Sequence, residues 1–182
     1  MKTLIIHPED KSTNFLKSIY ASVPDKTVLT EGDKVLVSEM VKSHQRIIMM
    51  GHGSPNGLFS VGKFDGTGGY VIDVDIVPLL RDKTNIFIWC NADQFVLKHG
   101  LNGFYSGMFV SEVGEALFCK LTECYDLERL VKESNDGFSR ILSEVIESPV
   151  DNMHKHVIEK YSEIAKNNKV ANYNLERLYK RS

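Results

Sequence analysis

The chain reads RIIMMGHG over residues 46–53 and IFIWCNAD over residues 86–93. Each segment opens with a short apolar run and ends in small or polar residues, which is typical of a strand buried on both faces of a parallel sheet. The residues between them can hold a crossover connection, so the two strands can be parallel neighbours. His52 and Cys90 would then lie side by side at the carboxyl edge of the sheet, where ligands bind in open α/β folds.

The elements around these two strands predict an α/β fold. Strands are expected over residues 3–6 and 27–30, and they alternate with helices that begin at Ser12 or Thr13 and at Asp33. This alternation is typical of a parallel sheet with right-handed crossovers. The glycine-rich segment 57–74 predicts a small β-hairpin lying over the sheet.

The second half of the chain is expected to be mainly helical. A further strand is expected over residues 104–110, before this helical part. Residues 170–179 are open to two interpretations, a late edge strand or a docked extension. We treat the 182 residues as one domain, with a sheet core over 1–125 and a mostly helical C-terminal part over 126–182. The expected elements are a strand over 104–110, helices over 112–121, 127–134, 138–147 and 153–166, and the open segment 170–179.

Composition excludes several classes of function. With 42% hydrophobic and 25% charged residues and a net charge of −2, we expect neither a nucleic-acid surface nor a surface for anionic membranes. No apolar run approaches the ~20 residues that span a bilayer, and no signal segment is recognisable, so we expect a cytoplasmic protein. The odd set of Cys90, Cys119 and Cys124 indicates reduced thiols rather than a disulfide framework. His154 and His156 do not share a helix face, and we expect no metal and no cofactor.

His52, Gly53 and Cys90 together suit nucleophilic catalysis. Cysteine attacks as its thiolate, and a neighbouring histidine can take the proton because imidazole titrates near neutral pH. The backbone N–H groups of Gly53 and Cys90 are candidate donors to a developing oxyanion. These residues therefore predict acyl transfer, with Cys119 and Cys124 as packing residues.

The same segments resemble a known family. MMGHG at 49–53 and FIWCN at 87–91 are similar to the histidine and cysteine strands of the caspase-like (clan CD) cysteine peptidases, and Cys90-Asn91 is similar to the version in CHAT-domain proteases. The group also includes caspases, metacaspases, legumain, clostripain and gingipains. The resemblance covers residues 1–113 in element order. It implies a three-layer α/β/α caspase-like sandwich with a mainly parallel sheet.

The resemblance also implies an activity. It indicates a cysteine endopeptidase that hydrolyses peptide bonds in a peptide or protein substrate, with Cys90 as nucleophile, His52 as base and Gly53 at the oxyanion. The family has a small residue where this chain has Trp89, which is expected either to reshape the site or to fill part of it. Ile88 occupies the position that lines the family's pocket for the substrate's P1 side chain, and it does not indicate a preference for arginine or lysine.

Acidic residues elsewhere in the chain could still supply a preference for arginine or lysine, and the candidates are Asp65, Asp73 and Asp93. The residues expected to line the substrate pocket are Ile88, Trp89, Asp93 and Asp65. Two alternatives remain open. One is a non-catalytic caspase-like binding or signalling module in which Cys90 only packs. The other is a flavodoxin-like or phosphate-binding domain that uses the same edge of the sheet.

Overall fold

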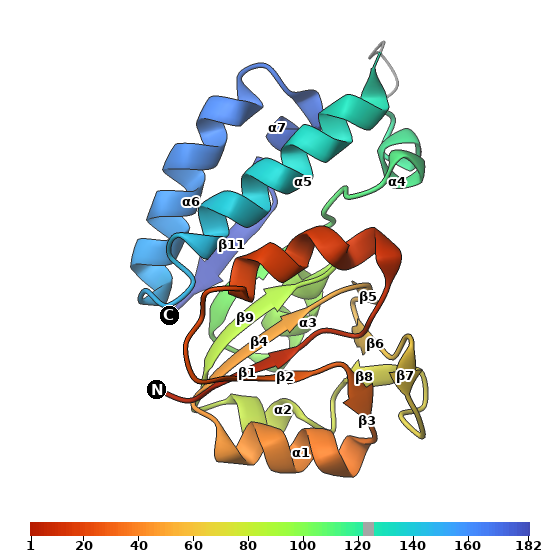
Figure 1. Ribbon diagram of the computed structural model, residues 1–182, viewed down its shortest axis with the longest axis vertical. Helices are drawn as coiled ribbons and strands as arrows, with labels where there is room; N and C mark the ends of the chain where they lie inside the picture. Colours follow the sequence, from red (N-terminus) through yellow and green to blue (C-terminus); the bar gives the residue numbers. More distant parts are fainter. Residues whose placement is uncertain (122–125) are drawn as a thin grey trace.

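The protein was analysed as a computed structural model that describes residues 1–121 and 126–182. Within these ranges the central sheet has six strands in the order β11-β10-β9-β4-β1-β2 (Figure 1). All neighbouring pairs are parallel except the antiparallel pair of β10 and β11. The expected α/β fold with a mainly parallel sheet is confirmed. The strands are β1 (Thr3–Ile6), β2 (Lys26–Leu29), β4 (Arg46–Met50), β9 (Thr84–Ile88), β10 (Gly103–Ser106) and β11 (Leu178–Arg181).

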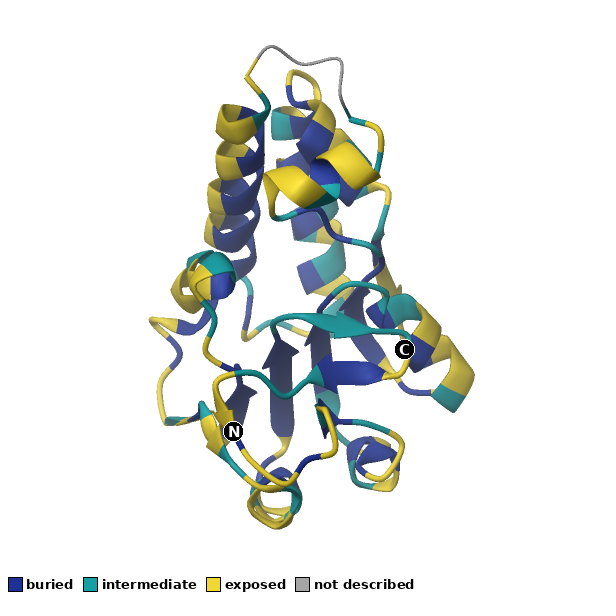
Figure 2. Cartoon of the chain, turned by 90° about the vertical axis from the view of Figure 1, so that its right-hand side faces the viewer, coloured by how far each residue is buried: buried dark blue, intermediate teal, exposed yellow. Residues whose placement is uncertain are grey.

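Side chains alternate between the two faces of the sheet and form two hydrophobic clusters. On β4 and β9, Ile48 and Ile88 belong to one cluster, and Met49 and Phe87 belong to the other. Both faces are apolar because helices cover both. The inner strands are buried almost throughout (Figure 2), whereas the edge strands β2 and β11 are partly exposed. One face is covered by η1 (Lys11–Tyr20, a 3-10 helix), α5 (Leu127–Ser143), α6 (Val150–Ala165) and α7 (Lys169–Leu175), and the other by α1 (Lys34–Ser43), α2 (Val77–Leu80) and α3 (Ala92–His99) (Figure 1).

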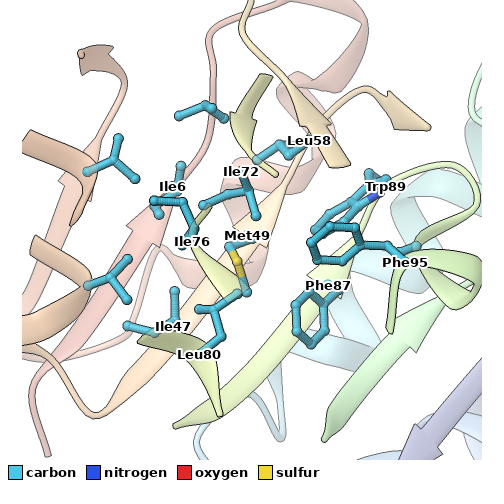
Figure 3. Packing of buried hydrophobic residues seen from close by; sticks show 14 of the residues in the cluster. Ile6, Ile47, Met49, Leu58, Ile72, Ile76, Leu80, Phe87, Trp89 and Phe95 are labelled. Carbon is cyan, nitrogen blue, oxygen red and sulfur yellow. The ribbon is translucent and has the colours of Figure 1, made fainter. Parts of the chain in front are cut away.

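An aromatic cluster fixes α3 against the carboxyl half of β9. Trp89 stacks edge-on against Phe87 and Phe95, with ring centroids 5.5 and 5.7 Å apart (Figure 3). All three rings are fully buried, and each contributes about 1.5–3 kcal/mol through burial. The cluster holds the junction between β9 and α3, where Cys90 lies.

Two small sheets accompany the central sheet. The expected hairpin is confirmed in the antiparallel pair of β6 (Gly57–Phe59) and β8 (Tyr70–Ile72), and β5 (Gly53–Ser54) adds a third strand. Gly57 has a φ of +144°, and a Cβ there would lie 1.9 Å from the carbonyl oxygen of Ile72, so only glycine fits. A second, parallel pair joins β3 (Glu31–Gly32) to β7 (Lys63–Phe64).

The first helix begins differently from the prediction. Ser12 or Thr13 was expected as its cap, but the cap is Asp10, whose carboxylate accepts a hydrogen bond from the Ser12 amide at 2.8 Å. Thr13 instead hydrogen-bonds His7 through its hydroxyl. The Ser12 hydroxyl is therefore available for another partner. The second expected cap, Asp33, is confirmed by its bond from the Leu36 amide.

The helical part also differs from the prediction in places. The helices expected over 127–134 and 138–147 are one continuous helix, α5, which ends at Ser143, and Gly137 lies inside it where α6 packs closely. A Cβ on Gly137 would lie 2.3 Å from Ile164 Cδ1, so the glycine marks a helix contact and not a break. The strand expected over 104–110 ends at Ser106, and α4 is short (Val113–Phe118).

The open segment 170–179 contains most of α7 and the start of edge strand β11, so the part of the chain after residue 126 also contributes to the sheet. Among the residues that the structure describes, no helix has the length and apolar character needed to cross a bilayer.

Candidate functional site

His52 and Cys90 lie at the same edge of the sheet. Met50 pairs with Ile88 in the parallel register of β4 and β9, and His52 and Cys90 each follow two residues later. Both line one pocket, with a cavity volume of about 20 Å³, which is room for one water molecule. The other residues that line it are Thr13, Phe15, Leu16, Gly51, Ile88, Trp89, Phe109 and Ser111. His52 and Cys90, the two side chains expected to lie side by side, therefore line the same pocket.

A hydrogen-bond relay orients His52. Its Nε2 lies 2.7 Å from Ser12 Oγ, and Ser12 Oγ lies 2.5 Å from Asp10 Oδ1. The serine hydroxyl has one proton, which it donates to the carboxylate, so the network assigns Nε2–H of His52 as the donor to Ser12. The neutral imidazole then has an unprotonated Nδ1, which is the atom that can accept a proton.

Asp10 adds a negative charge to this relay. Its Oδ1 lies 3.6 Å from His52 Nε2, so a negative charge lies next to the imidazole. Hydrogen bonds from the hydroxyl and the amide of Ser12 hold the pKa of Asp10 below its ordinary value, and His52 adds to this effect. Asp10 is therefore ionised at neutral pH, as a group that stabilises an imidazolium must be.

Cys90 has other partners than His52. Its thiol donates towards the carbonyl oxygen of Phe109 at 3.4 Å and towards Glu115 Oε1 at 3.6 Å. Burial raises the pKa of the Cys90 thiol to about 12, and the negative charge of Glu115 adds to this rise. The sequence suggested a thiolate assisted by histidine, whereas this structure holds a protonated thiol beside a carboxylate.

The backbone after Cys90 turns sharply. Asn91 has a φ of +64°, and its N–H donates to the carbonyl oxygen of Gly107 at 3.0 Å. The left-handed conformation lets β9 stop and α3 begin within one residue. Asparagine is one of the few residues other than glycine that adopts this conformation readily, so the turn places Cys90 at a fixed corner between strand and helix.

Gly53 and Trp89 fit each other directly. A Cβ on Gly53 would lie 2.3 Å from Trp89 Cδ1 and 2.7 Å from the carbonyl oxygen of Gly57. Trp89 Nε1 donates to the carbonyl oxygen of Ser54 at 3.1 Å, which ties β5 to β9. Trp89 thus points away from the sheet face of Ile88 and packs beneath β5, and its neighbour at this contact has to be glycine.

The remaining predicted pocket residues separate into two groups. Ile88 and Trp89 line the pocket with His52 and Cys90. Asp93 lies in the first turn of α3, and Asp65 is exposed between β7 and β8; neither lines this pocket. One carboxylate oxygen of Asp93 is buried with no hydrogen-bond partner within the described residues.

Three residues of the site escaped the sequence prediction. Asp10 and Ser12 lie at the start of η1, a few residues after the end of β1, and their position past a strand end was the available signal. Glu115 reaches Cys90 from α4, 25 residues further along the chain, and no local pattern indicates that contact.

No metal site competes with this chemistry among the described residues, because no group of three or more histidine, cysteine or acidic side chains gathers there. His154 and His156 have separate partners: His154 Nε2 lies 3.2 Å from the Leu178 carbonyl oxygen, and His156 Nε2 lies 2.9 Å from Glu144 Oε2. Cys119 ends α4, and Cys124 lies outside the described residues.

Sequence comparison matches the chain to no protein-family model and to no curated protein.

Proposed function

We propose that this protein is a caspase-like cysteine endopeptidase whose dyad is His52 and Cys90. The observation that carries the proposal is the shared pocket: a histidine and a cysteine from equivalent positions of adjacent parallel strands line one small cavity. The mainly parallel sheet with helices on both faces is compatible with a three-layer caspase-like sandwich. The substrate is a peptide or protein, and the reaction requires no cofactor.

The relay behind His52 supports a base at Nδ1. Because Nε2–H is directed to Ser12, the imidazole accepts the Cys90 proton at Nδ1 while Asp10 stabilises the positive charge that forms. The same proton passes to the leaving amine in the next step. Asp10 and Ser12 are therefore positioning residues in this mechanism.

The covalent steps follow from these roles. Cys90 Sγ attacks the carbonyl carbon of the scissile bond and forms a C–S bond, and the carbonyl oxygen becomes an oxyanion that the Gly53 N–H stabilises. The C–N bond then breaks as His52 protonates the amine. Water, with His52 as base, hydrolyses the thioester and returns the thiol.

A non-catalytic binding module is the second candidate, and one observation favours it. The Cys90 thiol is directed to Phe109 and Glu115, and its pKa of about 12 disfavours the thiolate in this conformation. On this alternative, Cys90 is a half-buried packing residue and the pocket has no chemical role.

Hydrolysis of a diverse peptide library distinguishes the two candidates. We expect cleaved products with the native chain, detected by mass spectrometry, and background levels with Cys90→Ala or His52→Ala, since residues of one catalytic unit lose nearly all activity singly. Cys119→Ser is the matched control and retains activity. Cleavage that persists in Cys90→Ala, or no cleavage of any library member by the native chain or by the more reactive variant described below, favours the binding module.

A further inference from the structure

Cys90 is held by a segment that does not belong to the proposed dyad. Phe109 supplies a carbonyl oxygen and Glu115 supplies a carboxylate, and both accept from the same thiol. Neither group can take the proton productively, because a carbonyl does not titrate and a carboxylate beside the sulfur opposes the thiolate by charge repulsion. The segment from Phe109 to Phe118 therefore stabilises the unreactive form of Cys90.

Glu115 is fixed in this position by several donors. Its Oε2 accepts from the Ser111 amide at 2.7 Å, from the Ser111 hydroxyl at 3.1 Å and from the Glu112 amide at 3.1 Å, while Oε1 faces Cys90. The side chain thus caps its own short helix and contacts the thiol at once. A carboxylate held by three donors stays in one orientation, so its contact with the sulfur is built into the loop.

The helical layer anchors the same loop. Asn174 of α7 accepts from the Val110 amide at 2.7 Å and donates to the Val110 carbonyl at 2.9 Å, and Asn135 of α5 donates to the Ser111 carbonyl at 2.8 Å. Both asparagines are buried. The arrangement of α5 and α7 therefore determines whether Phe109 and Glu115 remain on Cys90.

The pocket is also too small for a substrate in this state. Its volume of about 20 Å³ holds one water molecule, whereas an apolar cavity that binds a benzene-sized group has about 150 Å³. Phe109 and Ser111, which line the pocket, belong to the same segment as Glu115. Moving this segment would open the pocket and free the thiol in one step.

We propose that residues 109–118 are an autoinhibitory latch, in which Glu115 and the Phe109 carbonyl hold Cys90 as a thiol until displacement of the segment lets His52 reach it. This inference rests on the proposed function and concerns regulation of the same site. The titratable groups that face Cys90 are Glu115 and Cys119 from α4 and its end, and His52 across the pocket.

Thiol alkylation tests the latch without requiring peptidase activity. Glu115→Gln keeps one oxygen to cap α4 and removes the charge from beside the sulfur. We expect Cys90 to react with iodoacetamide at pH 8 at least ~10-fold faster in this variant, which corresponds to a fall of about one unit in the thiol pKa. The measurement is peptide mapping over time, with Cys119 as the internal reference thiol.

Glu112→Gln is the matched control, because it removes a neighbouring charge that has no contact with Cys90; its Cys90 rate should stay within about twofold of the native rate. Unchanged Cys90 labelling in Glu115→Gln, or a parallel rise at Cys90 and Cys119 that indicates general loosening, would overturn the latch. Ser111→Ala is the second variant: it keeps the carboxylate but removes one of its donors, and it should raise the Cys90 rate by a smaller factor.

Peptide cleavage separates this inference from the proposed function. Faster alkylation accompanied by faster cleavage supports both. Faster alkylation with no cleavage keeps the latch and removes the peptidase, whereas cleavage by the native chain that Glu115→Gln does not increase removes the latch and keeps the peptidase.

Discussion

His52 Nε2 lies 2.7 Å from Ser12 Oγ, and the Ser12 hydroxyl donates to Asp10 Oδ1 at 2.5 Å. The relay joins the loop after β1 to the loop after β4, two strands that are neighbours in the sheet. It fixes which imidazole nitrogen carries the proton, and so determines which nitrogen can act as a base.

Replacing Ser12 should reduce turnover more than binding. Ser12→Ala removes the group that accepts from Nε2–H, so we expect kcat to fall roughly 2- to 10-fold with little change in KM, as one hydrogen bond is worth about 0.5–1.5 kcal/mol. Ser12→Thr keeps the hydroxyl and should restore most of the rate. Ser18→Ala, on the exposed side of the same helix, is the control.

An unchanged kcat in Ser12→Ala, or a loss of kcat that Ser12→Thr does not restore, would show that the relay is not used.

Acid stability should depend on His7. This side chain is buried between Tyr20 and Thr13, and burial lowers its pKa to about 4, with the positive charge of Lys17 adding to the shift. The unfolded chain takes up this proton first as pH falls, because its histidine titrates near 6.5. The stability is therefore complete above pH 6.5 and is lost as pH falls towards 4, by about 3 kcal/mol.

Urea denaturation at pH 7 and pH 4 measures this loss. His7→Gln cannot gain the proton, so its free energy of unfolding should fall less between the two pH values than that of the native chain. His156→Gln, which alters an ion pair with Glu144 at the surface, is the control. Equal losses in the native chain and in His7→Gln would show that His7 is not the cause.

The contact between Gly53 and Trp89 should make Gly53 intolerant of substitution. Gly53→Ala places a Cβ inside the contact distance of a buried indole, and we expect it to lower the free energy of unfolding by about 1–3 kcal/mol. Gly114 in α4 has no heavy atom within 4 Å of an added Cβ, so Gly114→Ala should be neutral or stabilising by up to about 1 kcal/mol. Equal thermal midpoints for the two variants would contradict this packing.

The sequence predicted much of this fold because its signals were local. The apolar runs of β4 and β9 and the turn residues after them were enough to place His52 and Cys90 at one edge of a sheet. The hairpin formed by β6 and β8 was also indicated, because glycine residues and alternating apolar residues mark a hairpin within a short stretch.

The sequence failed to predict features that depend on contacts between residues far apart in the chain. Two helices were expected over 127–134 and 138–147, whereas the structure has the single helix α5, in which Gly137 packs against Ile164 of α6. Glu115 was not predicted as a partner of Cys90, since the contact depends on how α4 packs against α5 and not on any local sequence pattern. Trp89 differed from the family pattern, and the structure places its ring beneath β5, on Gly53.

Loosening the helical anchor should mimic release of the latch. Asn174→Ala leaves the buried amide and carbonyl of Val110 without partners, so we expect a loss of about 2 kcal/mol in stability and faster alkylation of Cys90. Asn172→Ala, on the exposed side of the same helix, should change neither quantity. A stability loss with no change in Cys90 labelling would separate the helical layer from the latch.

The central claim is that Cys90 forms a covalent acyl intermediate with the help of His52. The most direct measurement is the mass of the Glu115→Gln chain, acid-quenched within seconds of mixing with the peptide library and then mapped by peptide mass spectrometry. We expect an acyl group on the peptide that contains Cys90, absent when His52 is also replaced by alanine. A chain that cleaves peptides but carries its acyl group elsewhere, or that never carries one at any quench time, would contradict the assignment of Cys90 as nucleophile.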